Sequence, residues 1–454
     1  MTDEAFEIVP RIIRANERSR ITVAGRFELQ RFSRLAGDGR LKLEWIAAAG
    51  TLNRGERANW GEYHLAGVEL LAGEPDRITF ALPPLGEGEV HCRLLLEREG
   101  APRALICEFG VYALKSDLYA KRPFRGDLHV HSSYSACGNP DDDPKFIAAQ
   151  ARLRGLDFMA LTDHMQMGPS REVQSFVREF DTDFAIFTGE EVHLLEKRVE
   201  SLFRRNQFLP AIHLVNFGGE SGVGEYANAD FDRYLATIQA QAAKLDPAIP
   251  ESVRFLMAGA DWIIGRIHEV GGLAIFCHPF WRPEHRYNLP EPVREHMLAH
   301  SKFDAMEVIG LGATAADKQC AAYRESNQLC LAWWQEASLK RGKMIPLVGT
   351  TDSHATLELL GHQYTLVFAE DLSYASIAAA IRRGDSVAVS AWPGELPQLY
   401  GDFRLVQFGY FLLREFYGAH DVICQREGRL MLDRLRGESA DREAMARFFQ
   451  RNYA

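Results

Sequence analysis

The sequence contains no stretch with the pattern of a signal peptide or of a membrane span. Its N-terminal stretch has no apolar core of signal-peptide length and no small-residue cleavage pattern, and no run approaches the ~18 apolar residues of a membrane span. The seven cysteines are odd in number and scattered, without a CxxC pair. Such cysteines are typical of reduced thiols rather than of a disulfide framework or a zinc knuckle. We therefore expect a soluble, cytoplasmic protein with no membrane partner.

Basic residues are also in short supply. Lys and Arg number 52 against 62 Asp and Glu, which gives a formal net charge of −10 over 454 residues. Nonspecific affinity for duplex nucleic acid comes mainly from Lys and Arg that neutralise phosphates, so we expect no stable duplex nucleic acid partner. With 46% hydrophobic and 25% charged residues, the composition is that of a globular protein and excludes disordered, collagen-like and coiled-coil chains.

Alternating apolar residues mark the first part of the chain, residues 1–120. Ile78, Phe80 and Leu82 occupy every second position of one run, and similar runs recur between turn-like breaks. A period of two is typical of strands with one buried face. Several such strands at short spacing predict a β-sandwich-like N-terminal domain.

The pattern changes after residue 120. Apolar strands alternate with helical stretches, and seven strands can be counted up to TTDSH at 350–354. This order predicts an α/β fold with a mainly parallel sheet, and seven such units can close as a barrel with its chemistry at the carboxyl ends of the strands. We expect this domain to span 121–390 and a helical C-terminal extension to span 391–454.

Histidines and carboxylates end six of the seven strands. His129 and His131 are two residues apart on a strand and so share one face, and Asp352 and His354 repeat that spacing. The other strand ends carry His164, Glu190, Glu191, His193, His213 and His278. Charged groups gathered at a barrel mouth need a compensating partner, and imidazole with carboxylate is a ligand set for Zn, Mn or Fe. The sequence therefore predicts a metal centre.

The motifs GDLHVHS, LTDH, GEEV, HLVNF, CHP and TDSH, in this order over residues 121–390, resemble the PHP (polymerase and histidinol phosphatase) superfamily. The combination with LAWWQEASLKRGK is most similar to its carbaryl-hydrolase-like branch. The resemblance implies a distorted seven-stranded (β/α) PHP barrel that holds two or three divalent metal ions.

The resemblance also implies a role for each ligand. His129, His131 and Asp352 would hold a first metal, and Glu191 would bridge to a second metal. The spacing Gly-x-Glu favours Glu191 over Glu190 as the bridge. The remaining ligands would be His213 and His278 at the second metal and His164 and His354 at a third.

One position departs from the family pattern. Members with three metals carry an acid or a histidine five residues after the second His of HxH, where this chain has Ala136. Cys137 is adjacent and is a candidate soft ligand. Asp141, Asp142 and Asp143 are alternative ligands, although acids in NPDDDP are also typical of a helix N-terminus.

A carboxylate-bridged metal pair would generate the nucleophile from water, and neither GxSxG nor GxxxxGK is present. Besides the bridging Glu191, Asp352 would accept the proton from that water. His193 is a candidate acid, substrate contact or supporting imidazole. Arg282, in the loop after the fifth strand, is a candidate for binding phosphate or carboxylate.

The expected function is metal-dependent hydrolysis, first as a phosphoesterase acting on a small phosphate ester or nucleotide. An ester, amide or carbamate hydrolase with the same centre is the alternative. A metal-binding scaffold without catalysis is a second alternative.

Overall fold

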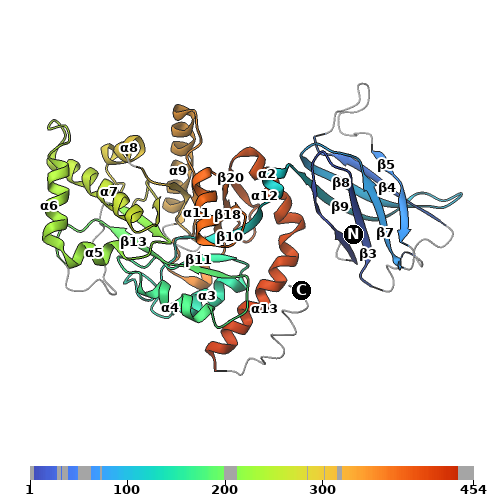
Figure 1. Cartoon of the computed structure of the whole chain (residues 1–454), viewed down its shortest axis with the longest axis horizontal. Helices are drawn as coiled ribbons and strands as arrows, with labels where there is room; N and C mark the ends of the chain where they lie inside the picture. The colour runs from blue at the N-terminus through green and yellow to red at the C-terminus, as the bar shows by residue number, and fades with distance from the viewer. Residues whose placement is uncertain are drawn as a thin grey trace. The chain divides into compact units, whose positions relative to one another are not determined.

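The computed structural model describes residues 5–27, 32, 39–49, 63–71, 74–198, 212–283, 285–300, 302–313 and 320–437. The chain forms two compact units (Figure 1). Unit 1 comprises Met1–Arg122 and Gln407–Gly418, and unit 2 comprises Pro123–Val406 and Ala419–Ala454. The domain boundaries at 120 and 390 stay predictions, and the last part of the expected C-terminal extension, 438–454, lies outside the described residues.

Unit 1 is built from two sheets, with strand orders β1-β3-β7-β6 and β2-β9-β8-β4-β5. The strands are β1 (Phe6–Val9), β2 (Ile12–Arg14), β3 (Ser19–Gly25), β4 (Arg40–Ala47), β5 (His64–Ala66), β6 (Val68–Leu71), β7 (Glu74–Leu82), β8 (Gly88–Glu97) and β9 (Ala104–Leu114). Ile78 and Phe80 of the first sheet share one buried core with Leu43 and Cys92 of the second. The alternation in the sequence therefore gives each sheet one buried face.

Unit 2 holds an α/β arrangement of two further sheets, ordered β12-β11-β10-β18-β19-β20 and β13-β14-β15-β16-β17. The strands are β10 (Arg122–Asp127), β11 (Phe158–Ala160), β12 (Ala185–Phe187), β13 (Gly189–His193), β14 (His213–Phe217), β15 (Leu273–Phe276), β16 (Ala305–Ile309), β17 (Leu347–Gly349), β18 (Gln363–Ala369), β19 (Ser386–Ser390) and β20 (Gln398–Gly401). Phe158 of one sheet and Ile275 of the other belong to the same buried cluster, so the core lies between the sheets.

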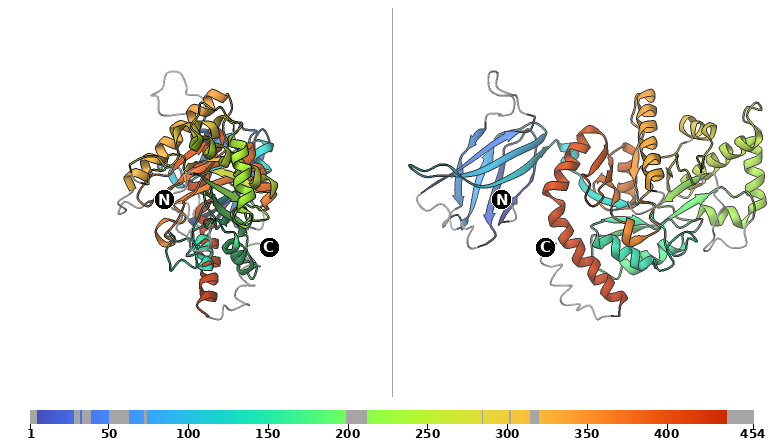
Figure 2. Two further views of the ribbon diagram at one scale, coloured as in Figure 1. Left: turned by 90° about the vertical axis from the view of Figure 1, so that its left-hand side faces the viewer. Right: turned by 180° about the vertical axis from the view of Figure 1, so that it is seen from behind.

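Helices of unit 2 lie around its two sheets (Figures 1 and 2). The described helices of the two units together are, in chain order, α2 (Ser116–Tyr119), α3 (Pro144–Leu153), α4 (Gly168–Val177), α5 (Val223–Ala229), α6 (Phe231–Ala242), α7 (Glu251–Glu269), α8 (Glu291–His300), α9 (Cys320–Arg341), α10 (Thr356–Leu359), α11 (Tyr374–Arg383), α12 (Phe403–Glu415) and α13 (Tyr417–Leu435). Among the described residues, no helix combines the length and the apolarity that crossing a bilayer requires.

The distorted seven-stranded barrel that we expected is not shown, because neither sheet of unit 2 closes on itself. The expected third strand is split at Thr188 into β12 and β13, which belong to different sheets. There the hydroxyl of Thr188 donates to the carbonyl of Gly219 at 2.8 Å, and its carbonyl accepts from Gly218 N–H at 2.7 Å. These bonds draw the chain away from β11 toward the loop after β14.

The expectation of a mainly parallel sheet is also only partly met. Strands β10 to β12 and β15 to β17 pair in parallel, whereas β13 to β15 and β18 to β20 pair antiparallel. Two isolated parallel bridges, Val130↔Ser353 and His164↔Glu191, join the two sheets beyond the ends of β10 and β11. The polar residues of the predicted metal centre lie at these bridges.

Helix α13 is held on unit 2 by buried charges. The guanidinium of Arg152, on α3, donates to Glu427 at 2.6 Å and to Asp157 at 3.1 Å. His420 lies 2.7 Å from the same Asp157 carboxylate. Because each of these charges has an opposite partner, their burial is compensated.

Candidate metal centre

The HxH segment sits where β10 leaves the sheet. The side chains of Leu128 and Val130 are fully buried, and His129 and His131 alternate with them. The two imidazoles therefore lie on one side, with their Nε2 atoms 3.2 Å apart. Extended backbone with a period of two is what brings this pair together.

Four donor atoms surround one point beside this pair. From His129 Nε2, Asp352 Oδ1 is 3.3 Å away and Glu191 Oε2 is 3.5 Å away. From His131 Nε2 the same two oxygens are 3.0 and 3.4 Å away. Ligand bonds of about 2.0–2.2 Å in a tetrahedral site place the donor atoms roughly 3.3–3.6 Å from one another. The four side chains therefore have the spacing of a tetrahedral metal site.

Glu191 lies at the centre of the cluster, and its side chain is almost completely buried. Its Oε1 lies 2.6 Å from His213 Nδ1 and 3.4 Å from His278 Nε2. Its Oε2 faces the HxH pair and lies 2.7 Å from His164 Nδ1. One carboxylate thus presents its two oxygens to two separate groups of imidazoles, which is the arrangement of a ligand that bridges two cations.

The neighbouring carboxylate has a different environment, because successive side chains of β13 point to opposite faces. Glu190 accepts hydrogen bonds from the Asn216 amide at 3.0 Å, from Val223 N–H and from Gly224 N–H at 3.2 Å. It therefore holds the start of α5 instead of facing the imidazoles.

Charges in the cluster are strongly interdependent. Burial opposes ionisation of Glu191, but the surrounding imidazoles, led by His213 and His164, hold the pKa of this carboxyl well below its usual range. Burial alone would lower the pKa of His129, yet Asp352 and Glu307 raise it well above its usual value. The buried, ionised carboxylates are stabilised by nearby positive charge, which bound cations would supply.

Several donor atoms have no hydrogen-bond partner among the described residues: His193 Nδ1 and Nε2, His213 Nε2 and Asp352 Oδ1. Buried polar atoms are rarely left unpaired, and coordination of a cation is one explanation for such atoms. The donor set and its spacing therefore fit divalent cations.

Backbone strain is concentrated at the same place. Among the described non-glycine residues, four have positive φ, and three of them belong to the site: Met165 (61°), directly after His164, His278 (23°) and Asp352 (48°). Such conformations cost about 1–3 kcal/mol each and persist where the surrounding structure enforces them. The fold therefore holds two candidate ligands, His278 and Asp352, in strained backbone conformations.

Glu307 is a candidate site residue to which the sequence analysis assigned no role. It is fully buried on β16, where its Oε1 lies 3.0 Å from His129 Nδ1 and its Oε2 accepts from His278 N–H at 2.8 Å. A carboxylate on the far nitrogen fixes the tautomer of a ligating histidine. The available signal was a charged residue inside the apolar run AMEVI, since a buried charge needs a partner.

His193 and Arg282 have different surroundings. His193 is buried in the cluster, with its ring centroid 4.2 Å from that of His213 and its Nε2 3.6 Å from Glu191 Oε2. Arg282, a third exposed, instead forms an ion pair with Glu325 at 3.2 Å.

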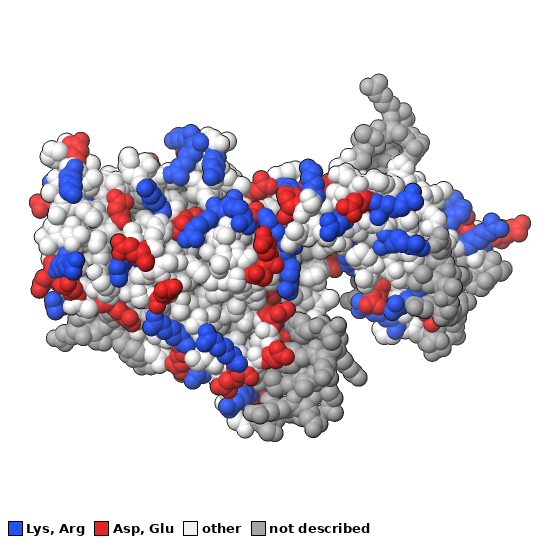
Figure 3. Space-filling model, in the orientation of Figure 1, with Lys and Arg blue, Asp and Glu red and all other residues white. Residues whose placement is uncertain are grey.

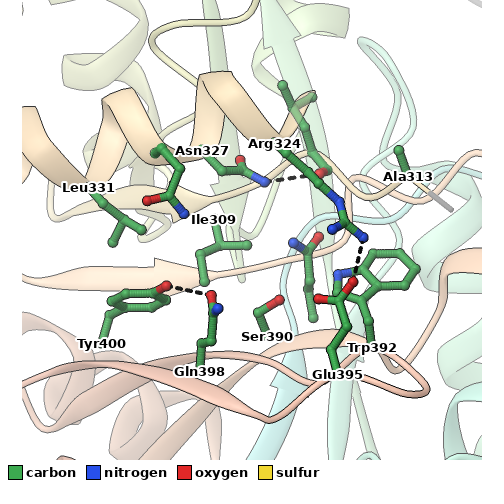
Figure 4. A pocket seen from close by; sticks show the side chains of 13 residues that line it. Ile309, Ala313, Arg324, Asn327, Leu331, Ser390, Trp392, Glu395, Gln398 and Tyr400 are labelled. Carbon is green, nitrogen blue, oxygen red and sulfur yellow. Dashed lines mark hydrogen bonds and ion pairs between the residues drawn. The ribbon is translucent and has the colours of Figure 1, made fainter. Parts of the chain in front are cut away.

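A cavity of about 130 Å³ lies between α9, β16 and the β19–β20 segment (Figure 4). An ion pair of 2.7 Å between Arg324 and Glu395 forms part of its wall. Gln363 contributes a buried Oε1 without a hydrogen-bond partner among the described residues. Aromatic walls come from Trp392 and Tyr400. The cavity therefore combines planar apolar surface with a free acceptor.

A backbone hydrogen bond links the wall of this cavity to the segment that carries a candidate ligand. Gly312, between the lining residues Leu311 and Ala313, donates its N–H to the carbonyl of Thr351 at 2.9 Å, and Thr351 directly precedes Asp352.

Comparisons with known proteins give limited similarity. No family model matches the sequence. An uncharacterised protein of Methanocaldococcus jannaschii, MJ1587, is 30% identical over 87 residues, which cover 17% of this chain and 50% of that protein. The chain therefore matches about half the length of this curated relative.

Solved structures with local similarity include two of endonuclease Q. One, in complex with a 27-mer duplex that carries an abasic lesion, is 17% identical, with 58% of this chain and 57% of that chain covered and a TM-score of 0.37. The Pyrococcus furiosus enzyme is 16% identical, with 61% and 58% covered and a TM-score of 0.35. A candidate metal-dependent phosphoesterase from Bifidobacterium adolescentis is 15% identical, with 64% and 96% covered and a TM-score of 0.32. All three scores lie below 0.5, so the function proposed below depends on the side-chain geometry.

One expectation is corrected by these comparisons. The net charge led us to exclude a stable duplex nucleic acid partner, and the similarity to a duplex-bound endonuclease contradicts that exclusion. The physical reason is that net charge does not describe a local field. On the described part of the face in Figure 3, acidic and basic side chains are interspersed, so the charge of −10 is not a uniform acidic surface.

Proposed function

We propose that this chain is a metal-dependent hydrolase of the PHP superfamily, and that it acts as a phosphoesterase on a small phosphate ester or nucleotide. The observation that carries the proposal is the tetrahedral spacing of donor atoms from His129, His131, Glu191 and Asp352, from 3.0 to 3.5 Å. Carboxylate-bridged pairs of cations are a common solution for phosphate-ester hydrolysis.

The residues present fit at least two divalent cations. His129, His131 and Asp352 would hold the first, Glu191 would bridge, and His213 and His278 would hold the second. When bound, such ions lower the pKa of water and stabilise the charge that develops on the electrophile.

The protein's own groups would manage the proton and the geometry. Asp352 Oδ2, the carboxylate oxygen that does not face the HxH pair, lies 3.9 Å from His278 Nε2 and would accept the proton from the attacking water. His193, whose ring nitrogens have no hydrogen-bond partner among the described residues, would contact the substrate. Glu307 would keep His129 in the tautomer that leaves Nε2 free for the metal.

A second candidate is hydrolysis of a neutral ester, amide or carbamate, as the resemblance to the carbaryl-hydrolase-like branch implies. A phosphate is usually clamped by arginine. Here Arg282 and Arg324 are each paired with a glutamate, Glu325 at 3.2 Å and Glu395 at 2.7 Å. This pairing favours a neutral electrophile.

A substrate panel separates the two activities. Protein reconstituted with Zn²⁺ or Mn²⁺ is assayed on p-nitrophenyl phosphate, its bis ester and a naphthyl carbamate. We expect turnover of a phosphate substrate. Turnover of the carbamate alone would refute the phosphoesterase assignment and support the second candidate, and no turnover at full metal occupancy would favour a scaffold.

The double variant His129→Ala/His131→Ala tests the site itself. It should lose bound metal and all activity while far-ultraviolet circular dichroism stays unchanged. His296→Ala is the matched control, because His296 pairs with Asp261 between α7 and α8, outside the cluster. Metal content that is unchanged in the double variant would contradict the site.

A further inference from the structure

A third set of imidazoles lacks one ligand of the pattern that the resemblance to the PHP superfamily implies. His131, His164 and His354 each offer a ligand atom, and these atoms lie within 4.8 Å of one another. The ring centroid of His131 is 4.4 Å from that of His164 and 4.3 Å from that of His354. The acid or histidine expected from the loop is replaced by Ala136, a methyl group that binds nothing.

The loop supplies a different donor at the next position. Cys137 Sγ lies 3.1 Å from His164 Nε2. In a tetrahedral site with metal–sulfur bonds of about 2.3 Å and metal–nitrogen bonds of about 2.0–2.1 Å, sulfur and nitrogen lie roughly 3.5 Å apart. A few tenths of an ångström of outward movement would make room for a cation.

The position of Cys137 is fixed by its neighbours. Gly138 donates its N–H to the carbonyl of Ser135 at 3.0 Å, and Asn139 donates its N–H to the carbonyl of His354 at 3.0 Å. A Cβ on Gly138 would lie 2.2 Å from the carbonyl oxygen of Ser132, so only glycine allows the loop to pass this closely. The loop that carries the thiol is therefore fastened to the segment that carries one of the imidazoles.

Of the three aspartates nearby that are alternative ligands, two accept hydrogen bonds from backbone N–H groups and one is exposed. Asp143 is the N-cap of α3 and accepts hydrogen bonds from the N–H groups of Lys145 and Phe146. Asp142 is buried and accepts from Thr356 N–H at 2.8 Å. Asp141 is exposed. The carboxylates of NPDDDP thus organise the helix start and the adjacent loop.

We infer that Cys137 is a thiolate ligand that completes a further metal site with His164 and His354. The inference rests on the metal centre proposed above and deepens it. Binding of a divalent cation by the thiol forms one sulfur–metal bond and releases one proton to solvent. Because thiolate is a soft ligand, this site would take Zn²⁺ or Co²⁺ in preference to Mg²⁺ or Mn²⁺.

Cobalt spectroscopy tests the inference without measuring activity. Metal-free full-length protein is titrated anaerobically with Co²⁺, and the near-ultraviolet absorption that a thiolate–Co²⁺ bond produces is recorded beside the total Co²⁺ bound. We expect this absorption in the parent protein and its loss in Cys137→Ser, together with the loss of one bound equivalent. Cys320→Ser is the matched control, because Cys320 is a partly exposed thiol on α9 whose Sγ lies 3.8 Å from the carbonyl of Ala313.

The outcomes are distinct. Near-ultraviolet absorption that persists in Cys137→Ser, or that is absent from the parent protein while two equivalents of Co²⁺ bind, would overturn the role of Cys137 and leave the bridged pair intact. Failure of the parent protein to bind any Co²⁺ would overturn the metal centre together with this inference. As a second readout, Zn²⁺ should protect Cys137 from iodoacetamide in the parent protein, and equal labelling with and without Zn²⁺ would contradict coordination.

Discussion

Replacing Glu307 by glutamine tests whether a residue that contacts the candidate metal ligands, and is not itself a ligand, affects metal affinity. The parent carboxylate accepts from three donors: its Oε1 lies 3.0 Å from His129 Nδ1 and accepts from the Thr350 hydroxyl, and its Oε2 accepts from His278 N–H at 2.8 Å. An amide has one oxygen and one NH₂ group, so Glu307→Gln keeps an acceptor at only one of these two oxygen positions and places a donor against the partner of the other. The change keeps the volume and removes the charge.

The magnitude follows from the role of such partners. Loss of a carboxylate that orients a ligating histidine typically costs about 10–100-fold in metal affinity. That loss corresponds to roughly 1.4–2.8 kcal/mol and is close to the cost of one buried polar group left unpaired, about 1–3 kcal/mol. The assay is competition for Zn²⁺ between the protein and a chromophoric chelator at fixed pH.

Glu190→Gln is the matched control. Glu190 is also fully buried and also accepts from backbone N–H groups, but its partners are Asn216 and the start of α5. This control should lower the free energy of unfolding while changing Zn²⁺ affinity less than Glu307→Gln does. Equal affinity losses in the two variants, or an unchanged affinity in Glu307→Gln, would refute the reasoning.

Three further changes test other parts of the molecule. Arg152→Leu should lower the free energy of unfolding in urea by about 3–5 kcal/mol, because it leaves Glu427 buried without its cation; a loss below 1 kcal/mol would contradict that pairing. Burial opposes the charge on His420, but Asp157 outweighs it and raises the pKa of His420 to about 11. The stabilisation from this ion pair is therefore complete below the unfolded pKa of about 6.5 and is lost as pH rises toward 11. His420→Ala should lower the free energy of unfolding by about 1.5–3 kcal/mol at pH 6 and by less at pH 10. An equal loss at the two pH values would refute the role of the charged imidazole. Gly138→Ala puts a Cβ 2.2 Å from a backbone oxygen, so we expect loss of the third metal equivalent with the first two kept, as measured by elemental analysis; full stoichiometry would show that the loop adapts.

Local sequence determined the chemistry-bearing positions because strand geometry is local. A period of two places His129 and His131 on one side whatever the strand pairs with, and the same period separates Glu191 from Glu190. The acids of NPDDDP likewise follow short-range rules, since Asp143 caps α3 through N–H groups two and three residues away. For these residues the sequence alone was sufficient to predict the local arrangement.

Pairing between distant segments was decided only by the tertiary structure. Periodicity says which face of a strand is buried and does not say which strand is its neighbour. The split at Thr188 and the antiparallel β14 were therefore missed, and the predicted distorted barrel is not shown, because neither sheet closes on itself. The partner of a buried charge is equally invisible along the chain. Glu307 meets His129 across 178 positions, and Arg152 meets Glu427 across 275.

At the candidate third metal site, the sequence and the tertiary structure each decide a different part. The sequence shows that Ala136 cannot bind a metal and leaves Cys137 and three aspartates as alternatives. The folded loop brings the thiol to 3.1 Å from His164, whereas Asp142 and Asp143 bond to backbone N–H groups. Residue type is a property of the sequence, but the choice among equivalent donors depends on distances that only packing sets.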